Sequence, residues 1–113
     1  MNSNTDKSYY AIIPASVRYD KNLSANSKLL YGEITALCNE KGYCWANNTY
    51  FSTLYKVSNR TITNWINELK GAGHIIVNYE RADVEGYSKR YIMLADTNVY
   101  AKPMGRKKSS STP

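Results

Sequence analysis

Between Ser58 and Lys70 the sequence "SNRTITNWINELK" carries polar side chains whose chemistry suits the reading of nucleic-acid bases. An Asn side chain can form two hydrogen bonds with adenine N6 and N7, an Arg side chain can do so with guanine O6 and N7, and a Thr can touch the thymine methyl. The pattern favours a helix face that enters a major groove. Because Asn is also abundant elsewhere in the chain, a merely solvated face remains the alternative. The polar set is Asn59, Arg60, Thr61, Thr63, Asn64 and Asn67.

Such a face must be held by an apolar stripe on the other side of the same helix. At about 100° per residue the apolar side chains of this stretch gather opposite the polar ones. Ser58 can cap the helix, and "GAG" at 71–73 ends it near Lys70. We expect Trp65 to pack in the core, and we interpret Glu68 as an ordinary solvated charge. The apolar set is Ile62, Trp65, Ile66, Leu69 and Ala72.

A shorter helix is predicted just upstream, joined to the first by a tight turn. Asn47 or Asn48 can cap it, with Phe51, Leu54 and Tyr55 turned inward. The turn is "KVS" at 56–58, in which we expect Val57 to be buried. A short helix, a turn and a second capped helix form the layout of a helix-turn-helix.

A longer helix precedes both. It begins at Ser24 and ends before Gly42, and a short extended piece, "YCW", follows at 43–45. Upstream of it, "YYAIIP" at 9–14 is extended because the residue before Pro14 avoids the helical region, and 15–23 gives one helical turn and a loop. The buried stripe of the long helix is predicted at Leu29, Leu30, Ile34, Leu37 and Cys38.

Two strands are predicted after "GAG", at 74–80 and 88–94, with Gly86 in the turn between them. Three helices followed by this hairpin give an α+β fold, mainly α, of the winged helix-turn-helix type: a three-helix core plus a C-terminal β-hairpin wing. Residues 79–91 carry no net charge, which argues against deep insertion of the wing into a minor groove. We therefore expect Lys89 or Arg90 to contact the flanking DNA backbone at most.

Two segments resemble known proteins. "VSNRTITNWINELKGAGHI" is similar to the winged helix-turn-helix pattern S-x-R-T-[VI]-x-x-[WY]-[IL]-x-x-L-x-x-x-G-x-[IL] of many bacterial DNA-binding proteins. The longer run "YYAIIPASVRYDKNLSANSKLLYGEITALCNEKGYCWANNTYF" resembles the N-terminal domain of replication initiators, or replisome organisers, of phages and plasmids of Gram-positive bacteria. The likeness spans residues 9–79. Its upstream part is more specific to this family than the helix-turn-helix segment, which is generic.

The resemblance implies a DNA-binding module with two contact regions. The DNA-facing positions of the recognition helix match Arg60, Thr61, Thr63 and Asn64. The start of the helix before it, where backbone N–H groups and small polar side chains can clamp phosphate, matches Asn47, Asn48 and Thr49. We also expect Tyr50, Lys56 and Ser58 to lie at the DNA backbone, and Tyr55 near it.

The composition limits the other function classes. The net charge is +6, but Lys102, Arg106, Lys107 and Lys108 supply four of these charges, so residues 1–101 have 11 basic and 9 acidic side chains. A single histidine, His74, with no Gly-rich phosphate loop and no carboxylate cluster, predicts no enzyme, no cofactor and no metal site. Cys38 and Cys44 are interpreted as reduced thiols of a cytoplasmic protein, and neither a signal peptide nor a membrane span is expected.

The chain divides into a disordered N-terminus at 1–8, a winged-helix DNA-binding domain at 9–101 and a basic flexible tail or linker at 102–113. The tail's "GRKK" either adds phosphate attraction or is a solvated linker. Its run-out in "SSSTP" suggests that the natural chain continues, in which case the missing part would recruit a helicase or helicase loader. The apolar segment Tyr9–Pro14 either packs on its own domain or pairs with a second copy, and we lean to a homodimer.

We therefore expect sequence-specific binding of double-stranded DNA, at an origin in plasmid or phage replication initiation. One alternative is a transcriptional regulator that binds an operator, because the fold alone does not separate the two roles. Another, from a different class, is a replisome scaffold that makes protein contacts without touching bases, which the mild charge of the folded body favours.

Overall fold

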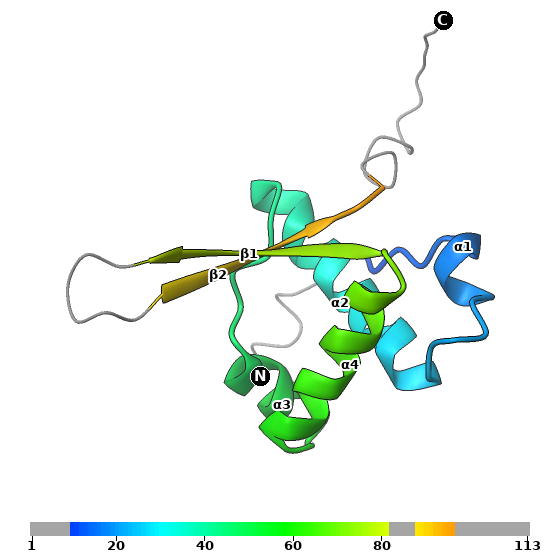
Figure 1. Cartoon of the computed structure of the whole chain (residues 1–113), viewed down its shortest axis with the longest axis horizontal. Coiled ribbons are helices and arrows are strands. Elements are labelled where there is room, and N and C mark those ends of the chain that lie inside the picture. The colour runs from blue at the N-terminus through cyan, green and yellow to red at the C-terminus, as the bar shows by residue number, and fades with distance from the viewer. Residues whose placement is uncertain (1–9, 82–87, 97–113) are drawn as a thin grey trace, which may run out of the picture.

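The arrangement of helices and strands follows the order expected from the sequence. A computed structural model describes residues 10–81 and 88–96 (Figure 1). The expected disordered N-terminus, the wing tip and the basic tail lie outside these residues. The elements are α1 (Ala15–Arg18), α2 (Ala25–Lys41), α3 (Asn48–Tyr55), α4 (Asn59–Gly71), β1 (Ile75–Arg81) and β2 (Ser88–Leu94).

Helix α2 begins and ends where its capping residues predict. The Ser24 hydroxyl accepts a hydrogen bond from the backbone N–H of Ser27, and Gly42 closes the helix in the left-handed region at φ 85°. Leu30, Ile34 and Cys38 are fully buried, as expected. Leu29 is wrong as a core residue, since 53% of it is exposed. One residue turns a helix by about 100°, so the stripe that runs through Leu30 and Ile34 leaves Leu29 outside.

Helix α3 contributes less to the core than predicted. Asn47 is its cap, because the Tyr50 N–H donates to Asn47 Oδ1 at 2.8 Å, and Phe51 is fully buried. Leu54 was predicted inward, but 39% of it is exposed. The half-buried Tyr55 packs at this end of the α3–α4 contact instead. Its ring is edge-on to that of Trp65, with 6.2 Å between the centroids.

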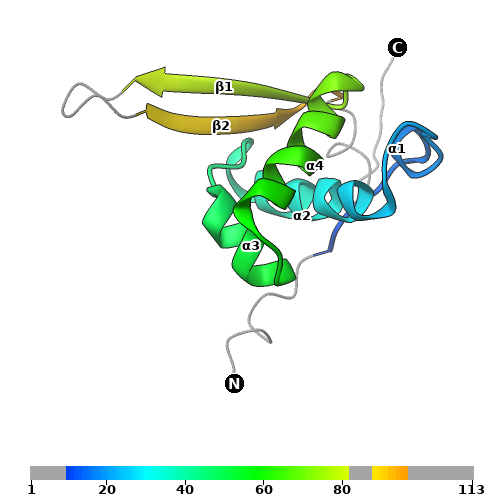
Figure 2. The ribbon, with the colours of Figure 1, turned by 60° about the horizontal axis from the view of Figure 1, so that its bottom comes forward.

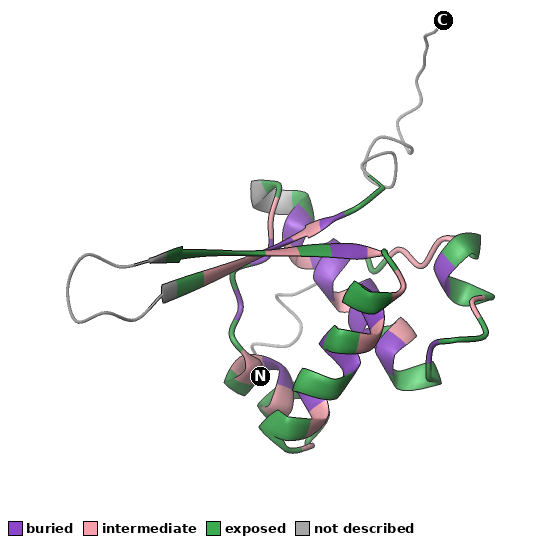
Figure 3. Ribbon diagram, viewed as in Figure 1, coloured by how far each residue is buried: buried purple, intermediate pink, exposed green. Residues whose placement is uncertain are grey.

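Helix α4 packs by its apolar stripe, as predicted. Ile62 and Leu69 are fully buried, Ile66 is 5% exposed and Trp65 is 9% exposed. Helix α4 crosses α2 and lies beside α3, and its opposite side is open to solvent (Figures 2 and 3). The stripe thus fixes which side of α4 faces outward.

The two strands form an antiparallel hairpin that extends beyond the helices (Figure 1). Its register pairs Ile75 with Leu94 and Val77 with Ile92, and this end covers the core. Cys44, in the predicted extended piece, bridges β2 with Cys44 N to Ile92 O at 2.8 Å and Ile92 N to Cys44 O at 2.9 Å. Helices α2, α3 and α4 with this hairpin form the expected winged helix-turn-helix.

The described part of the Tyr9–Pro14 segment packs on its own domain. The Ile12 N–H donates to Thr35 Oγ1 on α2 at 2.9 Å, and Ile12 and Ile13 lie against the core cluster. A Cβ at Gly32 would stand 3.1 Å from Ala11 Cβ and from Ile13 Cγ1, so α2 offers a glycine where the segment crosses it closely. Of the two alternatives left open by the sequence, these contacts favour intramolecular packing.

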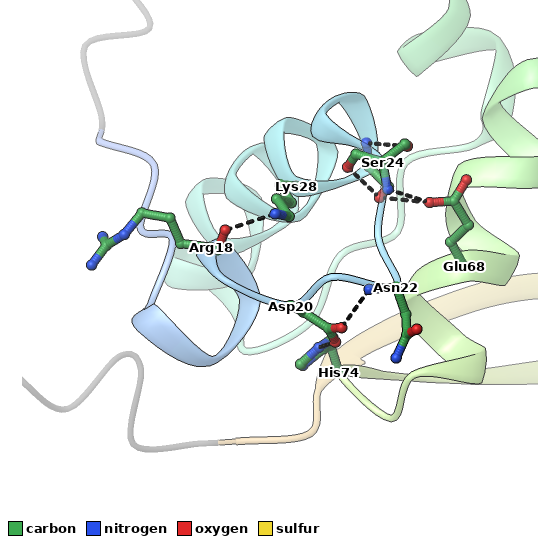
Figure 4. A network of polar contacts seen from close by, with 8 residues as sticks. Arg18, Asp20, Asn22, Ser24, Lys28, Glu68 and His74 are labelled. Carbon is green, nitrogen blue, oxygen red and sulfur yellow. Dashed lines mark hydrogen bonds and ion pairs between the residues drawn. The ribbon is translucent and has the colours of Figure 1, made fainter.

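Glu68 is not the ordinary solvated charge that the sequence suggested. Its Oε1 accepts the Ser24 backbone N–H at 2.8 Å and lies 2.9 Å from the Ser27 hydroxyl, so α4 supplies the carboxylate for the N-terminus of α2 (Figure 4). The Ser24 N–H above all, and then the Ser27 hydroxyl, lower the pKa of Glu68 from its ordinary 4.5. The contact joins residues 44 apart in the chain, which is why helical periodicity does not reveal it.

We expect Glu68→Gln to destabilise the protein by about 1 kcal/mol near neutral pH, because the amide keeps an acceptor but loses the charge at the helix terminus. The folded-state pKa is depressed, so the carboxylate's contribution is fully present above pH 4.5 and is lost as the pH falls through the lower folded value. Urea denaturation from pH 6 to 3 should therefore show the difference between the two proteins shrinking. A difference that stays constant over this range would contradict the assignment.

A second long-range contact joins the loop before α2 to the start of the hairpin. His74 Nε2 lies 2.8 Å from Asp20 Oδ2 (Figure 4). The bond from His74, and then the Asn22 N–H, lower the pKa of Asp20. His74 thus holds the corner between α4 and β1 against the loop that leads into α2.

Candidate nucleic-acid interface

The outward side of α4 carries three side chains with base-reading chemistry that have no partner in the described part of the chain. Arg60, Asn64 and Asn67 are exposed, and none makes a hydrogen bond or ion pair with residues 10–81 or 88–96. Their spacing of four and three residues places them along one helix face. Their guanidinium and amide groups are therefore free to bond an external partner.

Thr61 has a different environment from the other predicted contact residues. It is half-buried, its N–H donates to Ser58 Oγ at 3.1 Å, and its hydroxyl lies 3.0 Å from the same oxygen. Ser58 and Thr61 together form the N-terminal cap of α4. They therefore start α4 at Asn59, and this starting point sets which side chains of the helix face outward.

The turn between α3 and α4 places a cation between the two helices. Lys56 adopts φ 60° and ψ 48°, the left-handed conformation that ends α3, and its side chain is exposed. The Val57 N–H donates to Ser52 O at 3.0 Å, and Val57 is half-buried against the core rather than fully buried. A non-glycine residue in this conformation costs about 1 kcal/mol.

We expect Lys56→Gly to stabilise the fold by about 0.5–1 kcal/mol, because glycine adopts a positive φ without the steric cost. If Lys56 contacts phosphate, the same change should weaken DNA binding and reduce the salt slope of the binding constant by about 0.9. Lys56→Ala is the control, since it removes the same charge without relieving the backbone strain. Urea denaturation and binding titrations over a salt series measure the two effects, and an unstabilised glycine variant would contradict the strain argument.

The start of α3 is brought against the outward side of α4. Asn48 Nδ2 donates to Thr63 Oγ1 at 3.0 Å, and Asn59 Nδ2 donates to Thr49 Oγ1 at 3.4 Å. Thr63 Oγ1 also donates to Asn59 O at 3.1 Å. The predicted phosphate-clamp residues and the predicted base-reading residues thus form one continuous polar surface across two helices.

The electrostatics of this surface favour an anion. Neither α3 nor α4 has an acidic residue in its first turn. The N-terminus of a helix carries partial positive charge and backbone N–H groups that suit phosphate. The N-terminus of α2 also lacks a local acid but receives Glu68 from α4, so its positive end already has a carboxylate.

The wing presents its two predicted cations differently. Lys89 is exposed and lies opposite Glu80 in the register of the hairpin. Arg90 is half-buried: its Nη1 donates to Asn48 Oδ1 at 2.6 Å and its Nη2 to Ala46 O at 2.7 Å. Burial lowers the pKa of the Arg90 guanidinium from its ordinary value. Arg90 therefore joins the wing to the start of α3, a role that its position in the sequence did not reveal.

The aromatic residues near this surface differ in exposure. Tyr50 is half-buried, with its ring edge-on to Phe51 at 5.5 Å between centroids. Tyr79, which was not expected at the interface, is 66% exposed and lies opposite Arg90 in the register of the hairpin. Directly opposed residues of an antiparallel pair share a face. The register of the two strands therefore identifies Tyr79 as an exposed aromatic residue on the same face as Arg90.

Comparison with known protein families identifies the fold that carries this surface. Residues 21–75 match the model of a protein family described as a helix-turn-helix domain. The match covers α2, α3 and α4, a little under half of the chain, and stops at the first residue of β1. It supports a DNA-binding helix-turn-helix domain. Searches of curated proteins and of solved structures found no significant match.

Three further findings concern membrane spans, metal sites and cysteines. Among residues 10–81 and 88–96, no helix is long and apolar enough to span a membrane. Within the same residues, His, Cys, Asp and Glu side chains nowhere gather in a group of three or more that would hold a metal ion. Cys38 and Cys44 are both buried, and neither forms a disulfide.

Proposed function

We propose that this protein binds double-stranded DNA sequence-specifically, with the outward side of α4 in the major groove. In this arrangement Arg60 and Asn64 bond base edges, Asn67 extends the contact along the groove, and Thr63 touches a base or the backbone. Residues Asn47 to Thr49 at the start of α3, with Lys56 and Ser58 in the turn, lie against phosphates and fix the register.

The main observation behind the proposal is that one side of α4 is apolar and buried while the other is polar and exposed. Its apolar stripe is buried, while Arg60, Asn64 and Asn67 are exposed without a partner among the described residues. Asn and Thr are weaker helix formers than Glu, Lys or Ala, and each costs a few tenths of a kcal/mol on a solvated face. A base-contacting role explains why such residues stand where a solvated helix would carry Glu and Lys.

Selection of binding sites from a random duplex pool tests the proposal. We expect one sequence to be enriched and to be bound in a gel shift against excess random duplex. The protein should bind the enriched duplex at least about a thousandfold more tightly than random duplex at physiological salt. Absence of binding even at low salt would reject the proposal and favour a scaffold that contacts proteins, for which the near balance of 11 basic and 9 acidic residues in 1–101 is the supporting observation.

We further propose that the bound DNA is a replication origin of a plasmid or phage. The support is the resemblance of residues 9–79 to replication initiators, whereas the helix-turn-helix alone serves transcriptional regulators equally well. Footprinting on the cognate replicon distinguishes the two roles: repeated sites inside an origin support initiation, and one operator over a promoter supports regulation. Recruitment of a helicase or helicase loader by other regions of the protein belongs to the initiator role.

A further inference from the structure

A chain of hydrogen bonds runs from the wing through α3 to the outward side of α4. Arg90 Nη1 donates to Asn48 Oδ1 at 2.6 Å, Asn48 Nδ2 donates to Thr63 Oγ1 at 3.0 Å, and Thr63 Oγ1 donates to Asn59 O at 3.1 Å. Residues 90 and 48 are separated by 42 positions in the sequence. This chain of hydrogen bonds therefore connects β2 with α4, the helix proposed to read DNA.

Each link in this chain restricts what the next side chain can do. The bond from Arg90 fixes which end of the Asn48 amide is the acceptor, so the amide nitrogen points to Thr63. The Thr63 hydroxyl then uses its proton on Asn59 O and one lone pair on Asn48. The Thr63 hydroxyl then has one lone pair left and no proton to donate, and its methyl is available for an apolar contact, such as with a thymine methyl.

The position of Arg90 also opposes a direct contact with phosphate. Its Nη1 and Nη2 each already have an acceptor, and the side chain is half-buried. Turning the guanidinium outward would strip Asn48 Oδ1 and the carbonyl of the buried Ala46 of this donor. A buried acceptor without a partner is costly.

We propose that Arg90 is a positioning residue of the interface: through Asn48 it orients Thr63, and so sets base preference from the wing without contacting DNA itself. The inference rests on the proposed function, because it concerns the same surface of α4. It makes the wing a support for the recognition helix, in place of the flanking phosphate contact expected from the sequence.

Neighbouring wing variants that each remove one positive charge provide the test. The duplex selected from the random pool is titrated over a salt series with Arg90→Gln and with Lys89→Gln. We expect Arg90→Gln to leave the salt slope unchanged and to lower discrimination between the selected site and its single-base variants by about three- to tenfold, the worth of one hydrogen bond. A slope reduced by about 0.9 would show a lost phosphate contact and overturn the proposal, as would unchanged discrimination.

A second pair of changes tests the route through Thr63. Asn48→Ala interrupts the chain while keeping the Arg90 charge, and we expect it to reproduce the loss of discrimination if Arg90→Gln folds poorly. Thr63→Val keeps the methyl but removes the hydroxyl, so adding Arg90→Gln to it should cause no further loss. Independent, additive losses would overturn the coupling. If no duplex is selected at all, the proposed function fails first, and this inference fails with it.

Discussion

Asn64→Ala should weaken binding to the selected duplex by about 1–3 kcal/mol and relax the preference at one base pair. The Asn64 side chain lies on the exposed side of α4 and makes no hydrogen bond within the described residues. Its amide can therefore offer both a donor and an acceptor to adenine, and alanine offers neither. The measurement is a set of binding titrations with the selected duplex and with each single-base variant of it.

Asn78→Ala is the matched control for this prediction. Asn78 is also exposed, but it lies on β1 and alternates with Val77, which packs against the core. We expect its loss to leave both affinity and base preference unchanged. If Asn64→Ala weakened binding to all duplexes equally, Asn64 would be a backbone contact and its assignment to base reading would be wrong.

Leu30→Ala should destabilise the protein by about 2–5 kcal/mol. Leu30 is fully buried on α2, in the cluster that also contains residues of α4 and of both strands. Removing its side chain leaves a cavity that the surrounding residues can fill only in part. The free energy of unfolding from urea denaturation measures the effect.

The neighbouring Leu29→Ala is the control, because it makes the same chemical change at a site that is 53% exposed. We expect its effect to stay within about 0.5 kcal/mol, as for other surface substitutions, since alanine is also a good helix former. Equal and large losses at both positions would show that Leu29 is covered in solution and would contradict its observed exposure.

Local signals in the sequence were sufficient to place the elements of the helix-turn-helix. Ser24, Asn47 and Ser58 cap α2, α3 and α4 as predicted, because capping depends on a side chain and a backbone N–H two or three residues away. The hairpin strands agree with their predicted bounds to within one residue at each end. The apolar stripe of α4 was also predicted correctly, since 13 residues repeat the helical period several times.

Burial at the edges of the elements was predicted less well. Leu29 and Leu54 were expected in the core, but they are 53% and 39% exposed. Periodicity gives the direction in which a side chain points around its own helix, but not whether another element reaches far enough to cover it. Near the margin of a stripe or in a helix as short as α3, the neighbouring element decides the outcome.

The polar contacts that position the candidate interface could not be predicted from the sequence. Glu68 with Ser24, His74 with Asp20, and Arg90 with Asn48 each join residues more than 40 positions apart. Each of these side chains looks like a surface charge or polar group in the sequence, and only its distant partner gives it a structural role.

The sequence alone determined the helices, their caps and the side of α4 that faces outward, because these depend on residues within one or two turns of each other. The tertiary structure alone decided which polar side chains of that surface are free and which are already bonded. Arg60, Asn64 and Asn67 remain free among the described residues, whereas Asn48 and Thr63 are held in a chain that starts at Arg90. A hydrogen bond forms only where donor and acceptor meet within about 3 Å, and for groups on different elements the packing of the core sets that distance.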